Sequence, residues 1–375
     1  MTSLIRLSLK PCPAAGPSAL LALAFCLLPP ARAAGIPASM VEASGPHFLL
    51  SGRLDTRDPR GPVLVWQGSQ ASIDFEGPSL ALDFDRALGQ NFFDVSVDQQ
   101  VWVAAVPPGG PTRLSCPLPL SAGRHHLSLQ KRDEASAGSV QFRGIEVAGG
   151  TRTWRPASPA HPLAMEFYGD SITAGACDED GASDQWEDRS THNALKSYAA
   201  LTADAFGADS RNISVSGIGV VTGWDTVIES QVWNRLYPRE DSSSADLSLW
   251  RPDIVLVNLG DNDAGFTEAH KLGFPSAFTA KYIELIQGIR GAYPHADIVL
   301  LMGGMETGFR SVPLNEAWNR AVKELESGDP RIHHYVFQHW STLHPRVADH
   351  RILANELIAW LGRQPFMQRA GRPEM

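Results

Sequence analysis

The stretch EFYGDSITAG, residues 166–175, is the corner around which we predict the fold of the second half of the chain. An apolar run ends at Tyr168 and meets Gly169-Asp170-Ser171, and the residues that follow Ser171 can open a helix. A serine at such a corner is either an ordinary helix cap or a nucleophile. The sequence on either side has to decide between these two interpretations.

From about residue 160 onward, the sequence alternates between apolar runs and stretches that can form helices. Strands are expected at 212–216, 253–258, 297–302 and 331–337. The middle two are almost continuously apolar, as is typical of parallel strands buried on both faces. Helices are expected at 194–206, 277–291, 313–326 and 351–361. This alternation predicts a three-layer α/β/α domain with a parallel sheet over residues 160–365.

The carboxyl ends of the predicted strands carry residues that suit acyl transfer. Ligands of open α/β sheets bind beyond these ends, where the sequence places Ser171, Gly217, Asn262 and His344. Ser171 has the chemistry of a nucleophile, and His344 can act as the base that takes its proton. The N–H groups of Ser171 and Gly217 and the amide of Asn262 can donate to the oxyanion of a tetrahedral intermediate, helped by the helix dipole at Ser171. Such a site needs no metal and no organic cofactor.

These four blocks, in this order, resemble the SGNH/GDSL hydrolase superfamily, whose blocks carry Ser, Gly, Asn and His. The resemblance covers about residues 160–362 and implies a serine esterase. One position departs from the pattern, because the superfamily usually has Asp three residues before the histidine and this chain has Ser341. We therefore predict a Ser–His dyad in which a backbone carbonyl holds the Nδ1–H of His344. Asp349 is a candidate substitute for the missing acid, but its spacing does not favour that role.

Residues 40–150 consist of short runs that alternate apolar and polar residues between turns rich in Gly and Pro. This pattern predicts an N-terminal β-sandwich of jelly-roll type. With the stretches WQGS (66–69), FEG (75–77) and KRDEA (131–135), the domain looks like that of carbohydrate esterase family 2. The resemblance implies an enzyme that removes acetyl groups from xylan or glucomannan. Its expected partner is an acetylated polysaccharide or oligosaccharide.

The first 33 residues have the pattern of a secretory signal peptide. Arg6 and Lys10 precede an apolar core at 19–28, and Ala31-Arg32-Ala33 fits a cleavage site. We expect a periplasmic or secreted monomer without a membrane segment after cleavage, and a retained N-terminal anchor is the alternative. The formal net charge of −9 gives no basic footprint for nucleic acid and favours a neutral substrate.

Two of the four cysteines, Cys12 and Cys26, lie within the predicted signal peptide. In an oxidising compartment, the remaining Cys116 and Cys177 form either an inter-domain disulfide or two separate buried thiols. The sequence leaves both arrangements open.

Several residues allow a second interpretation. Gly219 is a rival of Gly217 as an oxyanion donor. The glycine-rich stretch that begins at Gly217 lacks the third glycine of a dinucleotide-binding fingerprint, because Thr222 occupies that position. Trp224 and Trp340 are candidates for stacking on sugar rings, and the alternative is that both are core tryptophans.

The sequence also allows other classes of site and of protein. His339, His344 and His350 could form a metal cluster, although no carboxylate at a suitable spacing supports it. A non-catalytic carbohydrate-binding protein and a broad-specificity, lipase-like short-chain esterase are the alternatives for the whole chain. An α/β-hydrolase is disfavoured because no G-x-S-x-G elbow surrounds Ser171.

Overall fold

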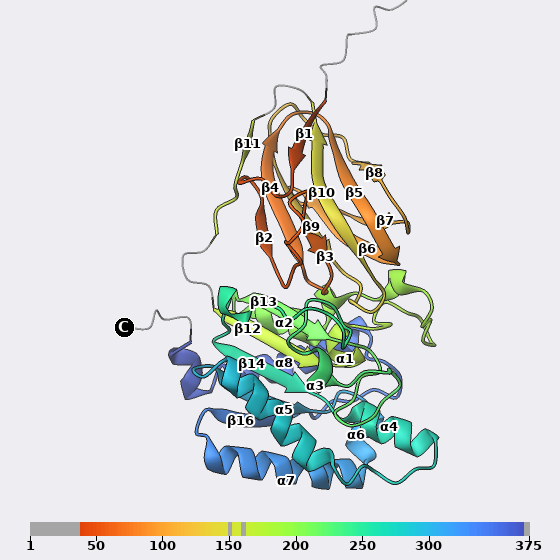
Figure 1. Cartoon of the computed structure of the whole chain (residues 1–375), viewed down its shortest axis with the longest axis vertical. Helices are drawn as coiled ribbons and strands as arrows, with labels where there is room; N and C mark the ends of the chain where they lie inside the picture. Colours follow the sequence, from red (N-terminus) through yellow and green to blue (C-terminus); the bar gives the residue numbers. More distant parts are fainter. Residues whose placement is uncertain (1–37, 149–151, 159–162, 371–375) are drawn as a thin grey trace, which may run out of the picture. The chain divides into compact units, whose positions relative to one another are not determined.

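The computed structural model describes residues 38–148, 152–158 and 163–370. The predicted signal peptide, residues 1–33, and part of the linker between the predicted domains lie outside these residues. Among the described helices, none is long and apolar enough to cross a lipid bilayer. The described chain forms a β-sandwich followed by an α/β domain with a parallel sheet, which confirms the predicted fold class (Figure 1).

The sandwich consists of two antiparallel sheets. Its strands are β1 (Ser39–Glu42), β2 (Leu49–Ser51), β3 (Val63–Leu64), β4 (Gln70–Glu76), β5 (Leu80–Gly89), β6 (Asn91–Val97), β7 (Gln100–Val106), β8 (Thr112–Ser115), β9 (Arg124–Lys131), β10 (Gly138–Val147) and β11 (Thr153–Trp154). One sheet has the order β1-β10-β5-β8 with β3 beside β10, and the other has the order β11-β4-β9-β6-β7 with β2 beside β4. Phe84, Phe93 and Phe142 meet between the sheets, which accounts for the alternating pattern of the sequence.

The α/β domain is built on one parallel sheet of the order β13-β12-β14-β15-β16. Its strands are β12 (Ala164–Gly169), β13 (Asp209–Ser214), β14 (Ile254–Asn258), β15 (Asp297–Met302) and β16 (Ile332–Val336). Its α-helices are α1 (Ser171–Ala174), α2 (Tyr198–Ala205), α3 (Glu229–Val232), α4 (Asp261–Ala269), α5 (Phe278–Ala292), α6 (Glu306–Arg310), α7 (Val312–Gly328) and α8 (Val347–Leu361). Short 3-10 turns span Arg189–Thr191, Ala194–Lys196, Leu247–Leu249 and Pro365–Gln368.

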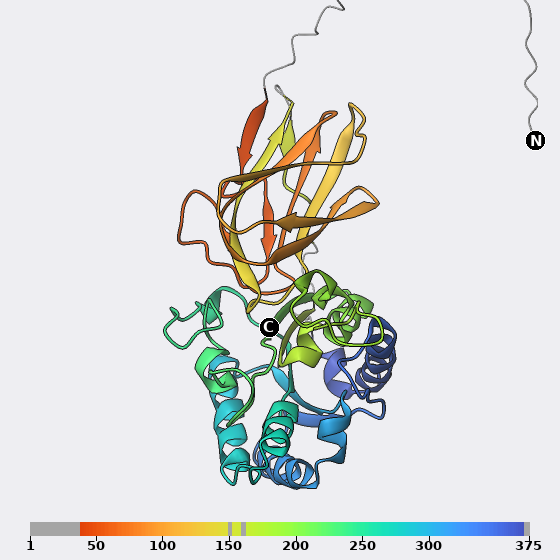
Figure 2. The same ribbon diagram turned by 90° about the vertical axis from the view of Figure 1, so that its right-hand side faces the viewer.

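Helices cover both faces of this sheet. Val255 and Val257 of β14 belong to the apolar core that includes α5 and α7, while Ile254 and Leu256 belong to the core that includes α2 and α8. In Figure 2 the cyan α5 and the violet-blue α8 lie on opposite sides of the sheet. Because every side chain of β14 is buried, the strand reads as a continuous apolar run.

Several predicted bounds are wrong in detail. The helix expected at 351–361 begins four residues earlier, at Val347. The strand expected at 212–216 ends at Ser214, because its partner β12 ends opposite it at Gly169 and the chain turns there. Val215 and Ser216 therefore enter the loop that leads to Gly217. The helix expected at 194–206 is divided by Ser197, whose hydroxyl accepts the Ala200 N–H and starts α2 at Tyr198.

The sandwich contacts the α/β domain through the WQGS stretch (66–69) and through Arg53. Trp66 Nε1 donates to the Leu236 carbonyl at 3.0 Å, and Gln67 Nε2 donates to the Ser214 carbonyl at 2.8 Å. Arg53 forms an ion pair of 3.0 Å with Glu166 of β12, and both side chains are buried. Removing one partner of such a pair is costly, because a buried charge is left uncompensated. The contacts of Gln67 and Arg53 join the sandwich to β13 and β12, the two strands that lead to Gly217 and Ser171.

Candidate active site

A cavity of about 920 Å³ lies at the carboxyl ends of the parallel strands. Each of the five strands is followed in the chain by a residue that lines this cavity: Ser171, Gly217, Asn262, Met305 and His344. The structure therefore brings together the four residues of the sequence-based hypothesis. Their convergence follows from the topology, because parallel strands all end at the same edge of the sheet.

Ser171 is the first residue of the single-turn helix α1. Asp170 is the cap of this helix, because its Oδ1 accepts the Ile172 N–H at 3.0 Å. Gly169 precedes them at a crowded position, where a Cβ would stand 2.2 Å from the Thr173 Oγ1. The capping role that was one interpretation of Ser171 therefore belongs to Asp170, and the Ser171 hydroxyl is left for other chemistry.

Gly217 offers a backbone N–H at the edge of the cavity. Its φ is +81°, a conformation that favours glycine, and a Cβ would approach the Trp224 Cβ to 3.2 Å. The rival Gly219 is not among the residues that line the described cavity, and a Cβ there would collide with the Thr222 carbonyl at 1.8 Å. The geometry thus favours Gly217 as the oxyanion donor and gives Gly219 a packing role.

Asn262 lies in the first turn of α4 with its amide held at the cavity. Its Nδ2 donates to the Ile218 carbonyl at 2.9 Å and to Asp170 Oδ2 at 3.2 Å. These two bonds engage both hydrogens of the Asn262 amide, so that an oxyanion has to share or replace one of them. Asp263 accepts three consecutive backbone N–H groups from residues 220–222. Burial raises the pKa of Asp263 to about 6, although these bonds lower it. The carboxyl holds this loop together.

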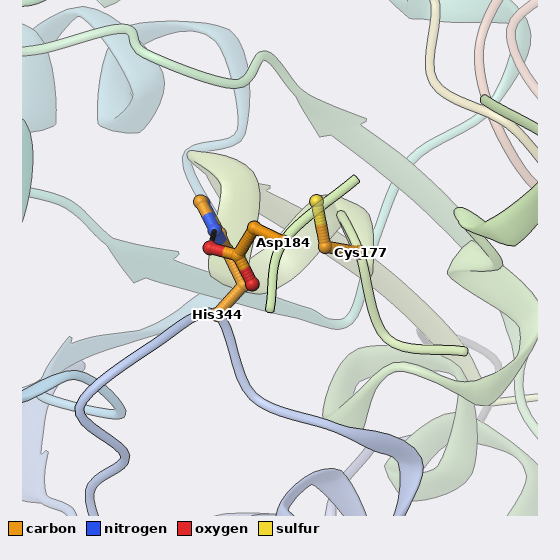
Figure 3. A group of neighbouring side chains, drawn as sticks. All are labelled: Cys177, Asp184 and His344. Atoms are coloured by element: carbon orange, nitrogen blue, oxygen red, sulfur yellow. Dashed lines mark hydrogen bonds and ion pairs between the residues drawn. The ribbon is translucent and has the colours of Figure 1, made fainter. Parts of the chain in front are cut away.

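The candidate base His344 contacts a carboxylate, against expectation. Its Nδ1 lies 2.7 Å from Oδ2 of Asp184, and Figure 3 shows the two side chains facing each other. The predicted dyad with a backbone carbonyl at Nδ1 is therefore wrong. Ser341, at the position of the usual Asp, instead donates its hydroxyl to the Leu343 carbonyl at 2.6 Å. The acid comes from the loop after α1 rather than from the loop of the histidine.

Arg346 holds the second oxygen of this carboxylate, since its Nη1 lies 2.8 Å from Asp184 Oδ1. Burial raises the pKa of Asp184, but the hydrogen bonds from His344 and Arg346 outweigh burial and lower the pKa to about 2. An ionised Asp184 orients the imidazole and stabilises its cation. Among the residues described, no hydrogen bond joins Ser171 to His344, and catalytic bonds of this kind often tighten only around substrate.

A chain of contacts joins both sides of the cavity to the sandwich. Trp186 stacks on His344 with ring centroids 5.6 Å apart, and the Arg189 guanidinium lies 4.2 Å from the Trp186 ring. Arg189 donates to Glu134 Oε1 at 2.9 Å, and Glu134 Oε2 accepts the Ser216 N–H at 2.9 Å. Glu134 is a buried sandwich residue, and sequence reasoning gave it no role in the site. One carboxylate thus supports both the loop of Gly217 and the aromatic wall beside the histidine.

The two candidate sugar-stacking tryptophans differ in position. Trp224 lines the cavity with 57% of its surface exposed and packs edge-on against Phe266. Trp340 stacks on Phe309 with centroids 5.0 Å apart and is not among the described residues that line the cavity. The expected stacking role therefore has a structural basis at Trp224.

The three histidines of the possible metal cluster do not gather. His339 Nε2 lies 2.7 Å from Asp349 Oδ1, so that the Asp349 carboxylate contacts His339 and not His344. His350 is buried, and its Nδ1 accepts the Tyr198 N–H at 3.1 Å. Asp349 therefore does not supply the acid of the site.

The two cysteines of the described chain are separate thiols, so the disulfide arrangement is not the one observed. Cys177 is fully buried beside the site, with Sγ 3.5 Å from His192 Nε2. Burial, with the charge of Asp184 nearby, raises the pKa of the Cys177 thiol.

The fold, and the order of the four residues around one cavity, define the class of GDSL-like hydrolases. The model of the GDSL-like Lipase/Acylhydrolase family matches residues 167–351, and the model described as Carbohydrate esterase 2 N-terminal matches residues 50–157. The chain belongs to carbohydrate esterase family 2.

Several relatives are similar over both domains. The cellulase/esterase CelE of Acetivibrio thermocellus is 32% identical over 335 residues, which are 85% of this chain and 39% of that protein. The chain thus spans well under half of CelE. An acetylxylan esterase / glucomannan deacetylase of Cellvibrio japonicus is 26% identical over 83% of this chain and 89% of its own length.

Several solved structures are also similar over both domains. A family two carbohydrate esterase from Clostridium thermocellum in complex with cellohexaose is 29% identical, with a TM-score of 0.74 over 84% of this chain and 98% of that chain. An active-site mutant of a family two esterase from the same organism has a TM-score of 0.77 at 28% identity, over 85% of this chain and 99% of that chain.

Proposed function

We propose that this protein is an exported esterase that removes O-acetyl groups from plant polysaccharides or oligosaccharides through an acetyl-serine intermediate. The observation that carries the proposal is the meeting of Ser171, the Asp184–His344 pair, Gly217 and Asn262 at one cavity. The names of relatives, which include an acetylxylan esterase / glucomannan deacetylase, support the acetyl group and the polysaccharide. Export rests on the pattern of residues 1–33.

In the first half of the reaction, Ser171 Oγ attacks the acetyl carbonyl while His344 takes the hydroxyl proton. Asp184 stabilises the imidazolium that forms, since its low pKa keeps it ionised. The N–H groups of Ser171 and Gly217 and the amide of Asn262 donate to the oxyanion. Because α1 has a single turn, we attribute this effect to the individual N–H groups rather than to a long helix dipole.

The intermediate then collapses, and the bond between the acetyl carbon and the sugar oxygen breaks. His344 gives its proton to the departing sugar oxygen, which becomes the free hydroxyl, and acetyl-Ser171 remains. Water attacks this ester while His344 again acts as base, and acetate is released with the serine restored.

The size of the cavity bears on the substrate. A volume of about 920 Å³ is far larger than an acetyl group and falls in the range of sites that enclose a ligand of several rings. The exposed face of Trp224 at the lining can pack on a sugar ring. We therefore propose that the sugar, rather than a long acyl chain, fills most of the space.

The test measures released acid from acetylated xylan, from acetylated glucomannan and from aryl esters of increasing chain length. We expect acetate release from at least one polysaccharide and a rate that falls steeply beyond acetyl, with His344→Ala inactive. Retention on the polysaccharide without acetate release would instead indicate a binding protein. Faster turnover of octanoyl than of acetyl esters would indicate a lipase-like esterase.

A further inference from the structure

Three side chains beside the nucleophile are of the kinds that bind transition metals. Cys177, Asp184 and His344 each offer one ligand atom, and these atoms all lie within 4.8 Å of one another (Figure 3). Cys177 and Asp184 come from the segment after α1, and His344 comes from the loop after β16. The three residues therefore meet because loops that follow two strands of the parallel sheet lie together at its edge.

Thiolate, imidazole and carboxylate are the ligand types of Zn²⁺ and related thiophilic cations. Ligand atoms that share one tetrahedral zinc stand roughly 3.5 Å apart, given bonds of about 2.0–2.3 Å. The Nδ1–Oδ2 distance of 2.7 Å must widen when a cation binds, and the sulfur, which lies within 4.8 Å of the other two ligand atoms, must move closer to them.

Cys177 has no role in the proposed hydrolysis, yet its position is demanding. Its φ is +57°, a conformation that disfavours a side chain such as cysteine. Its buried sulfur is not in a disulfide, and it is one of only two cysteines in the described residues. A thiol held in this way, with its sulfur within 4.8 Å of ligand atoms of Asp184 and His344, is a candidate third ligand.

We propose that Cys177, Asp184 and His344 form an inhibitory binding site for a thiophilic divalent cation of the zinc type. The cation takes the place of the proton between His344 and Asp184. Arg346 keeps its bond of 2.8 Å to Asp184 Oδ1, which leaves Oδ2 for the metal. The charges of a thiolate and a carboxylate offset those of the cation, so that the guanidinium of Arg346 does not exclude it.

The inhibitory consequence rests on the proposed function. Coordination at Nδ1 of His344 transfers the ring proton to Nε2, and Cys177 releases its thiol proton to solvent. An imidazole with Nε2 protonated cannot accept the proton of Ser171. Hydrolysis therefore stops while the metal is bound, and a chelator restores it.

The experiment titrates the parent protein, Cys177→Ser and the control Cys116→Ser with Zn²⁺ and records acetate release relative to each variant's own metal-free rate. We expect reversible inhibition of the parent and of Cys116→Ser, and at least a tenfold higher inhibitory concentration for Cys177→Ser. Equal sensitivity of Cys177→Ser and parent would overturn the proposal.

A spectroscopic arm does not depend on activity. Co²⁺ added to the parent should give a thiolate-to-cobalt charge-transfer band in the near ultraviolet, which Cys177→Ser should lack and Zn²⁺ should displace. Absence of the band in the parent would overturn the metal site even if the esterase is active. A band in a protein that hydrolyses no ester would support the site and contradict the proposed function instead.

Discussion

His344 Nδ1 lies 2.7 Å from Asp184 Oδ2, although the two residues are 160 positions apart in the chain. The carboxylate comes from the irregular segment after α1, where Arg346 also holds it. The position that usually carries the acid is occupied by Ser341, whose hydroxyl ties the loop to the Leu343 carbonyl. The site therefore has a Ser–His–Asp arrangement in which the acid comes from a different loop.

Asp184→Asn should lower kcat for acetyl esters by about a hundred- to ten-thousandfold, because the amide cannot stabilise the His344 cation and can hold the wrong tautomer. KM should change much less, since Asp184 is not among the residues that line the described cavity. Steady-state kinetics measure both quantities.

The matched control is Asp349→Asn, which removes the carboxylate that contacts His339. This variant should retain kcat within a few-fold. Equal losses of kcat in the two variants would mean that Asp184 acts only by stabilising the fold. Full activity of Asp184→Asn would mean that catalysis needs only Ser171 and His344.

Glu134→Gln should lower kcat about tenfold while KM changes little. The amide has one acceptor oxygen, so that it cannot serve both the Ser216 N–H and the Arg189 guanidinium, and a charged hydrogen bond is worth about 1.5–3 kcal/mol. Glu326→Gln removes the partner of exposed His334 and is the control. A fall in thermal stability without a change in kcat would show that Glu134 only joins the domains.

Trp224→Ala should raise KM for oligosaccharide acetates about tenfold and leave KM for a small aryl acetate nearly unchanged, because only the former offers a ring to stack on. Trp340→Ala, which disrupts a pair with Phe309 away from the cavity lining, should affect neither substrate. The measurement is KM of each variant for the oligosaccharide acetate and for the aryl acetate. Equal effects of both substitutions would argue against a sugar site at Trp224.

Asp261 gives a prediction for the pH dependence of stability. Burial raises its pKa to about 7, although a hydrogen bond from the Gly308 N–H lowers it. The unfolded carboxyl loses its proton near its ordinary pKa of 3.8, whereas the folded one keeps it up to about pH 7. The free energy of unfolding therefore falls as pH rises from about 4 to about 7, and this group changes it no further above that pH.

Asp261→Asn keeps the acceptor for Gly308 without this titration. We expect the variant to gain stability relative to the parent between about pH 5 and pH 8, by roughly 1–2 kcal/mol because contact with the cavity screens part of the effect. Urea unfolding at the two pH values measures the gain. A difference between variant and parent that does not change with pH would contradict it.

The sequence predicted those parts of the site that local patterns encode. Ser171, Gly217, Asn262 and His344 could be placed because each follows an apolar strand, and the ends of parallel strands converge. The end of β13 was misplaced, since it depends on where its partner β12 turns. The strands β1, β2, β8 and β11 have four residues or fewer, which are too few for an alternating pattern to predict them one by one.

The partners of the site residues were harder to predict. Asp184 lies in an acidic segment that also contains Asp178, Glu179 and Asp180, and nothing local distinguishes the one that reaches the histidine. Glu134 meets the Ser216 N–H across 82 positions and between two domains, a contact that only the packing of the sandwich creates. Both residues were inaccessible to periodicity and motif spacing for this reason.

The most direct test of the whole account is acetate release by Ser171→Ala, measured beside the parent on an acetylated sugar. Circular dichroism and thermal unfolding establish that the variant is folded. The account predicts a loss of kcat of more than about a thousandfold, because the oxygen that forms the acetyl-enzyme is gone. Turnover by folded Ser171→Ala at the parent's rate would contradict the assignment of Ser171 as the nucleophile.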